Sequence, residues 1–155
     1  MAMTPSRFER VRWNTFEESA CSPPLDEAAR GLRLAAPTRV TLAPDGPLPI
    51  AGVYQVDARF LNRFRSMKNE ITLVAVDASS HLPRAANLLE EGADPVESGF
   101  DPQDPDLDSI VVTGFFNLDL FHWIDDLPRR PARYHVFATV GDAVSNVVTI
   151  DVVAP

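Results

Sequence analysis

The sequence has few of the features that mark small secreted domains or membrane proteins. Among its 155 residues there is one cysteine, Cys21, so an intramolecular disulfide is impossible and a disulfide-stapled secreted domain is not expected. No apolar run approaches the roughly 18 residues that a transmembrane helix needs. The first residues carry charges where a secretory signal has an apolar run. We therefore expect a cytoplasmic protein without a membrane partner.

Glycine is scarce and proline is abundant. The chain has 7 glycines and 14 prolines. Because proline ends helices and is kept out of central strands, this composition favours a loop-rich, all-β design. Hydrophobic residues make up 45% of the chain, which is enough to bury a core, and the length suits one domain.

Basic residues are missing from residues 85–128, which contain 11 acidic residues, and the whole chain has a net charge of −8. A surface this acidic repels phosphate backbones, so no nucleic-acid partner is expected. A local basic cluster with two aromatic neighbours could stack on single-stranded nucleic acid. Its few charges favour pairing with the acidic residues instead. The cluster consists of Arg59, Arg63, Arg65 and Lys68, with Phe60 and Phe64 between them.

Residues 1–36 differ in pattern from the rest and are interpreted as an N-terminal arm with a short helix. Thr15-Phe16-Glu17-Glu18 has the spacing of a capping box. The segment Ser22–Gly31 is the better helix candidate, because serine caps helices, Pro23 suits the first helical position and glycine ends them.

From residue 37 to residue 155 the apolar residues recur with a period of two, which predicts strands. The clearest case is the end of the chain, where Tyr134, Val136, Ala138 and Val140 alternate before a turn at Gly141-Asp142. We expect further strands at 39–42, 53–61, 71–76 and 109–120, with 71–76 buried on both sides or under the arm. A long acidic excursion at 78–108 is expected to include a helical turn at 85–91. These elements predict an all-β, antiparallel β-sandwich with a short N-terminal helical arm.

The segments 127–138 and 145–152 resemble the last corner and the closing strand of bacterial immunoglobulin-like and fibronectin-like β-sandwich domains. The shared features are Leu127-Pro128, a small turn, Tyr134 and the alternating apolar positions that follow. The resemblance implies that the Tyr134 hydroxyl bonds to the corner backbone. Tyr134→Phe would then destabilise the fold by about 1–3 kcal/mol. The resemblance implies no activity, because such domains serve many functions.

Three alternating aspartates form the best candidate for a metal site. Carboxylate oxygens on a flexible loop are the ligands that Ca²⁺ prefers. An EF-hand is excluded because Ser109 and Phe115 occupy positions where that loop needs Gly and Glu. We expect a solvated acidic loop without a cofactor, and the alternative is a Ca²⁺-dependent binding module using residues 97–108. Its candidate ligands are Asp101, Asp104, Asp106 and Asp108.

No motif predicts catalysis. The three histidines, His81, His122 and His135, lack the spacing of metal ligands. Ser79-Ser80-His81 has no nucleophile elbow, and Cys21 has no partner motif. An enzyme whose site is assembled from distant residues remains a third possibility.

We therefore expect a non-catalytic interaction or accessory subunit that docks another protein, or a second copy of the chain, through the arm and loops. The expected contact residues are Phe8, Trp13 and Phe16, large aromatic residues in an otherwise polar segment. Aromatic anchors of this kind are enriched at interfaces. The alternative is that they are buried on the domain itself.

Overall fold

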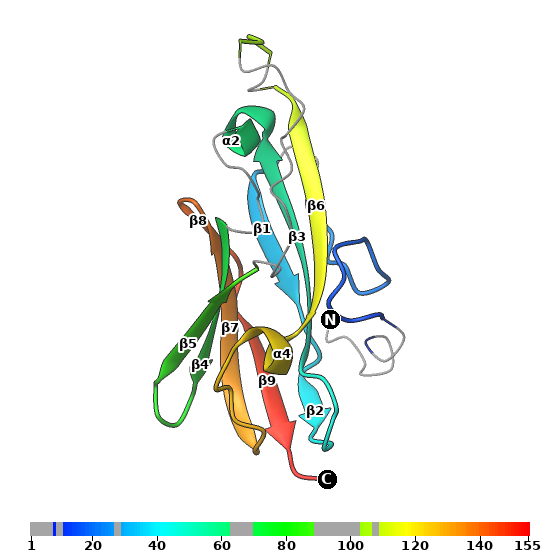
Figure 1. The fold of residues 1–155 in the computed structure, drawn as a ribbon, viewed down its shortest axis with the longest axis vertical. Coiled ribbons are helices and arrows are strands. Elements are labelled where there is room, and N and C mark those ends of the chain that lie inside the picture. The colour runs from blue at the N-terminus through cyan, green and yellow to red at the C-terminus, as the bar shows by residue number, and fades with distance from the viewer. Residues whose placement is uncertain (1–7, 9–10, 27–28, 63–69, 89–102, 107–108) are drawn as a thin grey trace.

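The computed structural model describes residues 8, 11–26, 29–62, 70–88, 103–106 and 109–155. Within them the fold is predominantly β, and the strands form two sheets that face each other (Figure 1). The predicted all-β class is confirmed at this level, as a sandwich-like fold. Among the described residues no helix is long and apolar enough to cross a bilayer.

The first sheet has three antiparallel strands in the order β1-β3-β6. They are β1 (Gly31–Ala35), β3 (Pro49–Asp57) and β6 (Val111–Asp119). Two glycines in this sheet have aromatic rings lying over them. A Cβ added to Gly52 would lie 2.0 Å from the Phe116 ring, and one added to Gly114 would lie 2.1 Å from the Tyr54 ring. The missing side chains therefore leave room for the two rings on the core face.

The second sheet has the strand order β2-β9-β7-β4-β5, and β8 also pairs with β7. Its strands are β2 (Arg39–Thr41), β4 (Ile71–Asp77), β5 (Pro83–Asn87), β7 (Ala132–Val140), β8 (Ala143–Val144) and β9 (Val148–Val153). All neighbours are antiparallel except β2, which runs parallel to β9. The predicted final hairpin is confirmed, with Tyr134 opposite Ile150.

Two predicted segments differ from the structure. The strand expected at 53–61 is β3, which ends at Asp57, and a short helix α2 (Ala58–Asn62) follows it. The helical turn expected from residue 85 is the strand β5 as far as Asn87, because residues 83–87 pair with β4. Residues 89–91 of that prediction lie outside the described residues. At β5 backbone pairing, and not local propensity, decides the conformation.

A further short helix, α4 (Leu120–Trp123), forms the corner that follows β6. The Asp119 carboxylate caps it by accepting from the Phe121 amide at 3.0 Å, and the same oxygen accepts from the Leu48 amide at 2.9 Å. This carboxylate therefore fixes both the helix and the approach to β3.

The main core lies between the sheets, and alternate residues of facing strands fill it. Ile50, Leu73, Leu118 and Ile150 are fully buried there. In β4 the burial alternates, so the expectation that this strand is buried on both sides, or under the arm, was wrong.

Tyr134 is in this core with 1% of its surface exposed, and its hydroxyl has no hydrogen-bond partner among the described residues. The bond from this hydroxyl to the corner, which the resemblance implied, is therefore not present. Burial raises the pKa of the Tyr134 hydroxyl, and the nearby charge of Asp77 raises the same pKa further. An unsatisfied buried hydroxyl destabilises the folded state.

We expect Tyr134→Phe to keep or raise the free energy of unfolding, by up to about 1–3 kcal/mol, because it removes a buried hydroxyl without a partner. The measurement is chemical unfolding at neutral pH. Val136→Ala, at a neighbouring buried position of β7, is the control that should destabilise by creating a cavity. A loss of stability in Tyr134→Phe would show that the hydroxyl is bonded after all.

The same variant should change the alkaline limb of the stability curve. Because the folded-state pKa of Tyr134 is raised, its contribution is present below the unfolded pKa of about 10 and is lost as pH rises towards the folded pKa. Stability of the wild type should therefore fall more steeply above pH 10 than stability of Tyr134→Phe.

Candidate binding groove beside the N-terminal segment

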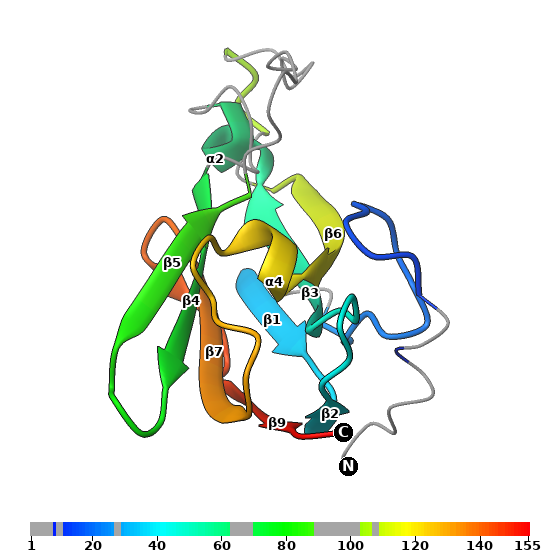
Figure 2. The same cartoon turned by 60° about the horizontal axis from the view of Figure 1, so that its bottom comes forward.

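The outer face of the first sheet, which points away from the main core, is also buried. Ala51, Val53, Gln55 and Asn117 on this face are between 0% and 6% exposed. Residues 8 and 11–26, called here the N-terminal segment, cover them. Both views place this blue segment beside β6 (Figures 1 and 2). Phe8 and Cys21 form a second small core with Ala51. The N-terminal segment is therefore a third layer of the fold.

Asn117 fastens this layer to β6. Its backbone exchanges two hydrogen bonds with the backbone of Thr15, at 3.0 and 2.8 Å. Its side-chain Nδ2 donates to the Thr15 hydroxyl at 3.1 Å and to the Glu17 carbonyl at 2.7 Å. Its Oδ1 accepts from the Ser19 hydroxyl at 2.7 Å. Each polar atom of this fully buried amide thus has a partner on the N-terminal segment.

Two further side chains hold the segment at its ends. Gln55 Nε2 donates to the carbonyls of Asp26 and Ala29, at 2.7 and 2.9 Å. Asn14, with φ of 62°, accepts from the Asp119 amide at 3.1 Å and from the Trp123 indole at 2.7 Å. The segment is therefore held by hydrogen bonds as well as by apolar contacts.

The predicted helices of the arm are not found in the described residues. Residues 11–26 contain no helix, and Thr15 forms a bridge with Asn117 where the capping-box spacing suggested a helix start. In the candidate helix 22–31, residues 22–26 and 29–30 are not helical, and residues 27–28 lie outside the described residues. Gly31, expected to end that helix, begins β1. Pairing with β3 and β6 satisfies backbone groups that a helix would satisfy internally.

The three aromatic residues predicted to contact a partner lie in two places. Phe8 is 2% exposed and stacks with Trp13, with ring centroids 6.2 Å apart and planes 10° apart. Phe16 instead meets Trp123 edge to face, with centroids 6.1 Å apart, and packs against the main core. Phe8 is thus buried on its own domain, and half-buried Trp13 offers the accessible ring. The role of all three in partner binding stays a prediction.

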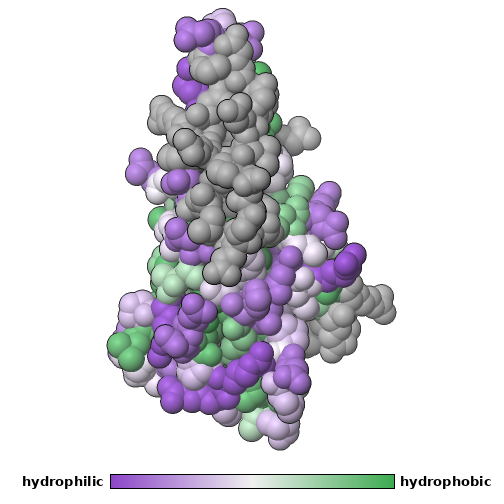
Figure 3. All heavy atoms as spheres, viewed as in Figure 1, coloured by the Kyte–Doolittle hydropathy of each residue, from purple (hydrophilic) through white to green (hydrophobic). Residues whose placement is uncertain are grey.

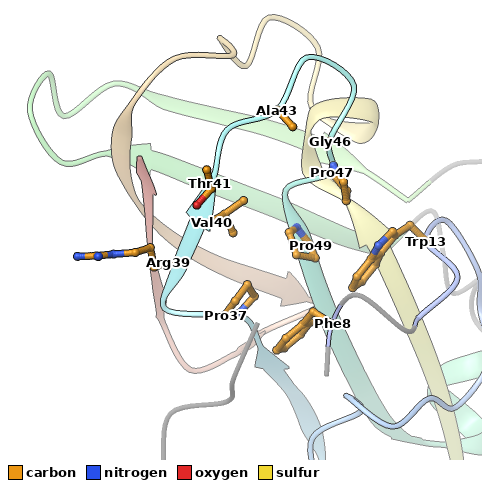
Figure 4. Close-up of a pocket in the computed structure, with 10 residues that line it drawn as sticks. All are labelled: Phe8, Trp13, Pro37, Arg39, Val40, Thr41, Ala43, Gly46, Pro47 and Pro49. Atoms are coloured by element: carbon orange, nitrogen blue, oxygen red, sulfur yellow. The ribbon is translucent and has the colours of Figure 1, made fainter. Parts of the chain in front are cut away.

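The stacked pair forms one wall of a groove of about 320 Å³, and β2 forms the opposite wall (Figure 4). Three prolines contribute to the lining, namely Pro37, Pro47 and Pro49. The Arg39 side chain points away from the cavity, so the interior is mainly apolar. On the face in Figure 3 the apolar residues are otherwise scattered among hydrophilic ones. The groove is therefore an apolar surface of a size that could hold a ligand.

Sequence reasoning identified the aromatic wall but missed the opposite one. β2 was predicted as a strand, yet nothing in its three residues indicates that it lies at an edge. The available signal was the proline spacing, because Pro37 precedes the strand and Pro47 and Pro49 follow it. Prolines around a short strand are typical of sheet edges.

The acidic excursion is described only in part. Of the four candidate Ca²⁺ ligands, Asp104 and Asp106 are described, and Asp101 and Asp108 lie outside the described residues. Asp104 Oδ1 accepts from the Asp106 amide at 2.9 Å, which forms a local turn. No group of three potential ligands that could hold a metal occurs in the part of the chain that the structure describes. The Ca²⁺ alternative stays a prediction.

Arg59 relates the basic cluster to this excursion. Its Nη2 lies 3.5 Å from the Asp104 carbonyl oxygen. The expected pairing between the two regions therefore includes a contact through a backbone oxygen. Arg63, Arg65 and Lys68 lie outside the described residues.

The described groups with catalytic potential are dispersed. His135 Nδ1 is 2.9 Å from the Thr149 hydroxyl on the neighbouring strand. His122 meets the Trp123 ring edge to face, and His81 lies in the turn before β5. Cys21 is completely buried in the second small core. Each of these side chains thus belongs to a different part of the molecule.

Comparison with known proteins gives the chain no family. No protein-family model matches it, and no curated protein matches it in sequence. The function must therefore be inferred from the fold and the groove.

We expect Asn117→Ala to lower the free energy of unfolding by about 2–3 kcal/mol, because it removes three hydrogen bonds that this buried amide makes to residues 15–19. Tryptophan fluorescence should shift to the red at the same time, as the segment carrying Trp13 loosens. Asn87→Ala, at an exposed position of β5, is the matched control and should change stability by at most about 0.5 kcal/mol. Equal stability of the two variants would refute the role of Asn117.

Proposed function

We propose that this chain is a non-catalytic interaction module, built on an immunoglobulin-like β-sandwich, that binds a partner protein in the groove between Trp13 and β2. As an accessory subunit it would act in the cytoplasm and need no cofactor. The groove, which joins an aromatic wall to an exposed strand edge, is the observation that carries this proposal.

The strand order supports the immunoglobulin-like assignment. In such domains one sheet contains strands G, F and C, extended in some by C′, and the other contains A, B and E. The order β9-β7-β4-β5 corresponds to the first set, and β1-β3-β6 corresponds to the second. Tyr134 lies near the start of β7, the position of strand F, where these domains carry their corner tyrosine.

The composition of the groove supports a role in binding. Ligand sites are mainly apolar clefts of about 300–1,000 Å³, and the groove is at the lower end of this range. Tryptophan is enriched at the centres of interfaces because its ring covers a large area with few rotatable bonds. Trp13 is held in place by stacking on Phe8, so little order has to be gained on binding.

The placement of the described titratable groups also favours binding over catalysis. A nucleophile and its base have to lie within hydrogen-bonding distance of each other. Cys21 is buried beside Phe8, whereas His135 pairs with Thr149 on the second sheet. Neither side chain lines the groove.

The proposal predicts that a partner depends on the groove. The tagged full chain would be purified from cells that express it, with its bound proteins identified by mass spectrometry. Thr41 lines the groove at an exposed position, so Thr41→Arg adds a long charged side chain at the rim of the groove and should leave the fold intact. We expect it to reduce recovery of a specific partner at least about tenfold, the loss of one ordinary interface contact.

Leu82→Arg is the matched control, because Leu82 is 59% exposed in the turn between β4 and β5, outside the groove. It should recover the partner as the wild type does. Melting temperatures of both variants establish that they are folded. A partner recovered equally with both variants would place its site elsewhere, and no specific partner at all would argue against the proposed function.

A further inference from the structure

We propose that the groove binds an extended, uncharged segment of the partner protein as an additional strand on the free edge of β2. This inference rests on the proposed function and specifies the chemistry of the partner.

The backbone of β2 provides the first argument. Its bonds to β9 include Thr38 O to the Asp151 amide, at 2.9 Å, and the Leu42 amide to Val153 O, at 2.8 Å. In a parallel ladder alternate residues bond to the same neighbour, so residues 38, 40 and 42 face β9. The N–H and C=O groups of Arg39 and Thr41 therefore point to the other side. Among the described residues neither residue has a backbone partner there.

This free side of β2 faces the groove. Figure 4 shows β9 on one side of β2, and Pro49, Trp13 and Phe8 on the other. An occupant that satisfies both residues has to present donors and acceptors at the spacing of a strand. A polyproline segment lacks the donors, so an extended peptide fits better.

Other sheet edges carry features that hinder the addition of a strand. On β1 the Asn146 side chain bonds both backbone groups of Leu34, at 2.8 and 3.0 Å. On β6 the Thr15 bridge occupies Asn117. Strand β5 begins with Pro83, which cannot donate to a neighbouring strand. A strand edge whose backbone groups are unpaired, such as the free edge of β2, is the usual position for strand addition.

The lining defines the side chains of the peptide. The walls are the aromatic pair, three prolines and Val40, and the Arg39 side chain points away. A charged side chain in the groove would lose its water without gaining an ion pair. Alternate residues of the peptide should therefore be proline-sized or aliphatic and should pack on Trp13. Because β2 offers free backbone groups at two residues, Arg39 and Thr41, the peptide should bind weakly and reversibly.

The test begins with random peptides of about 10 residues, the upper length of ordinary strands, displayed on phage and selected on the full chain. Selected sequences are synthesised, and their dissociation constants are measured by fluorescence anisotropy. Each backbone amide is then methylated in turn. We expect methylation at two residues spaced two apart to weaken binding at least about tenfold, and methylation of the residue between them to have little effect.

A pair of protein variants tests the same bonds from the other side. Thr41→Pro removes one of the two amides that point into the groove, and the ladder to β9 remains because it uses residues 40 and 42. Thr41→Val keeps that amide and a similar shape. We expect the proline variant to weaken peptide binding about tenfold and the valine variant to retain it. The methylation scan uses the wild type, so it decides the matter even if the proline variant does not fold.

Three outcomes would overturn the inference. Peptides that bind in the groove without the alternating pattern would refute strand addition and leave the proposed function intact. Failure to select any peptide whose binding Thr41→Arg abolishes would refute a peptide site, and partner recovery would still test the proposed function independently. Self-association in sedimentation equilibrium that Thr41→Pro abolishes would identify a second copy of the chain as the occupant.

Discussion

The structure depends on covering the outer face of its first sheet. This sheet carries apolar side chains such as Val53 on that side as well as on its core side. A sheet with two apolar faces needs a covering layer on each. The second sheet covers one face, and the N-terminal segment covers the other. The buried amide of Asn117 makes this arrangement specific, because its bonds fix residues 15–19 in one register on β6.

The groove follows from this constraint. Once the segment is fixed on the first sheet, Phe8 is buried against it and Trp13 stacks on the outside. The chain then passes from β1 in the first sheet to β2 in the second within a few residues. Among the described strands β9 is then the neighbour of β2, and the other edge of β2 faces Trp13. A structural layer and a binding surface are thus made by the same segment.

Much of the second sheet could be predicted from the sequence, since alternation over residues 132–153 is strong and one face of each strand is buried. Predictions failed where distant pairing outweighs local signals. Gly31 has the features of a helix end, yet it opens β1, and Thr15 has a capping spacing, yet it pairs with Asn117. For the groove, residue type singled out Trp13 together with Phe8 and Phe16, but only the register of β2 shows which backbone groups are free.

The most direct test of this account is the melting temperature of a chain that lacks residues 1–20. The deletion removes Phe8 and the partners of Asn117, and it exposes the outer face of β3 and β6. The account predicts a fall of at least about 5–10 °C, because burial of one large side chain alone contributes about 2 kcal/mol. An unchanged melting temperature would show that the segment is an appendage and would contradict the account.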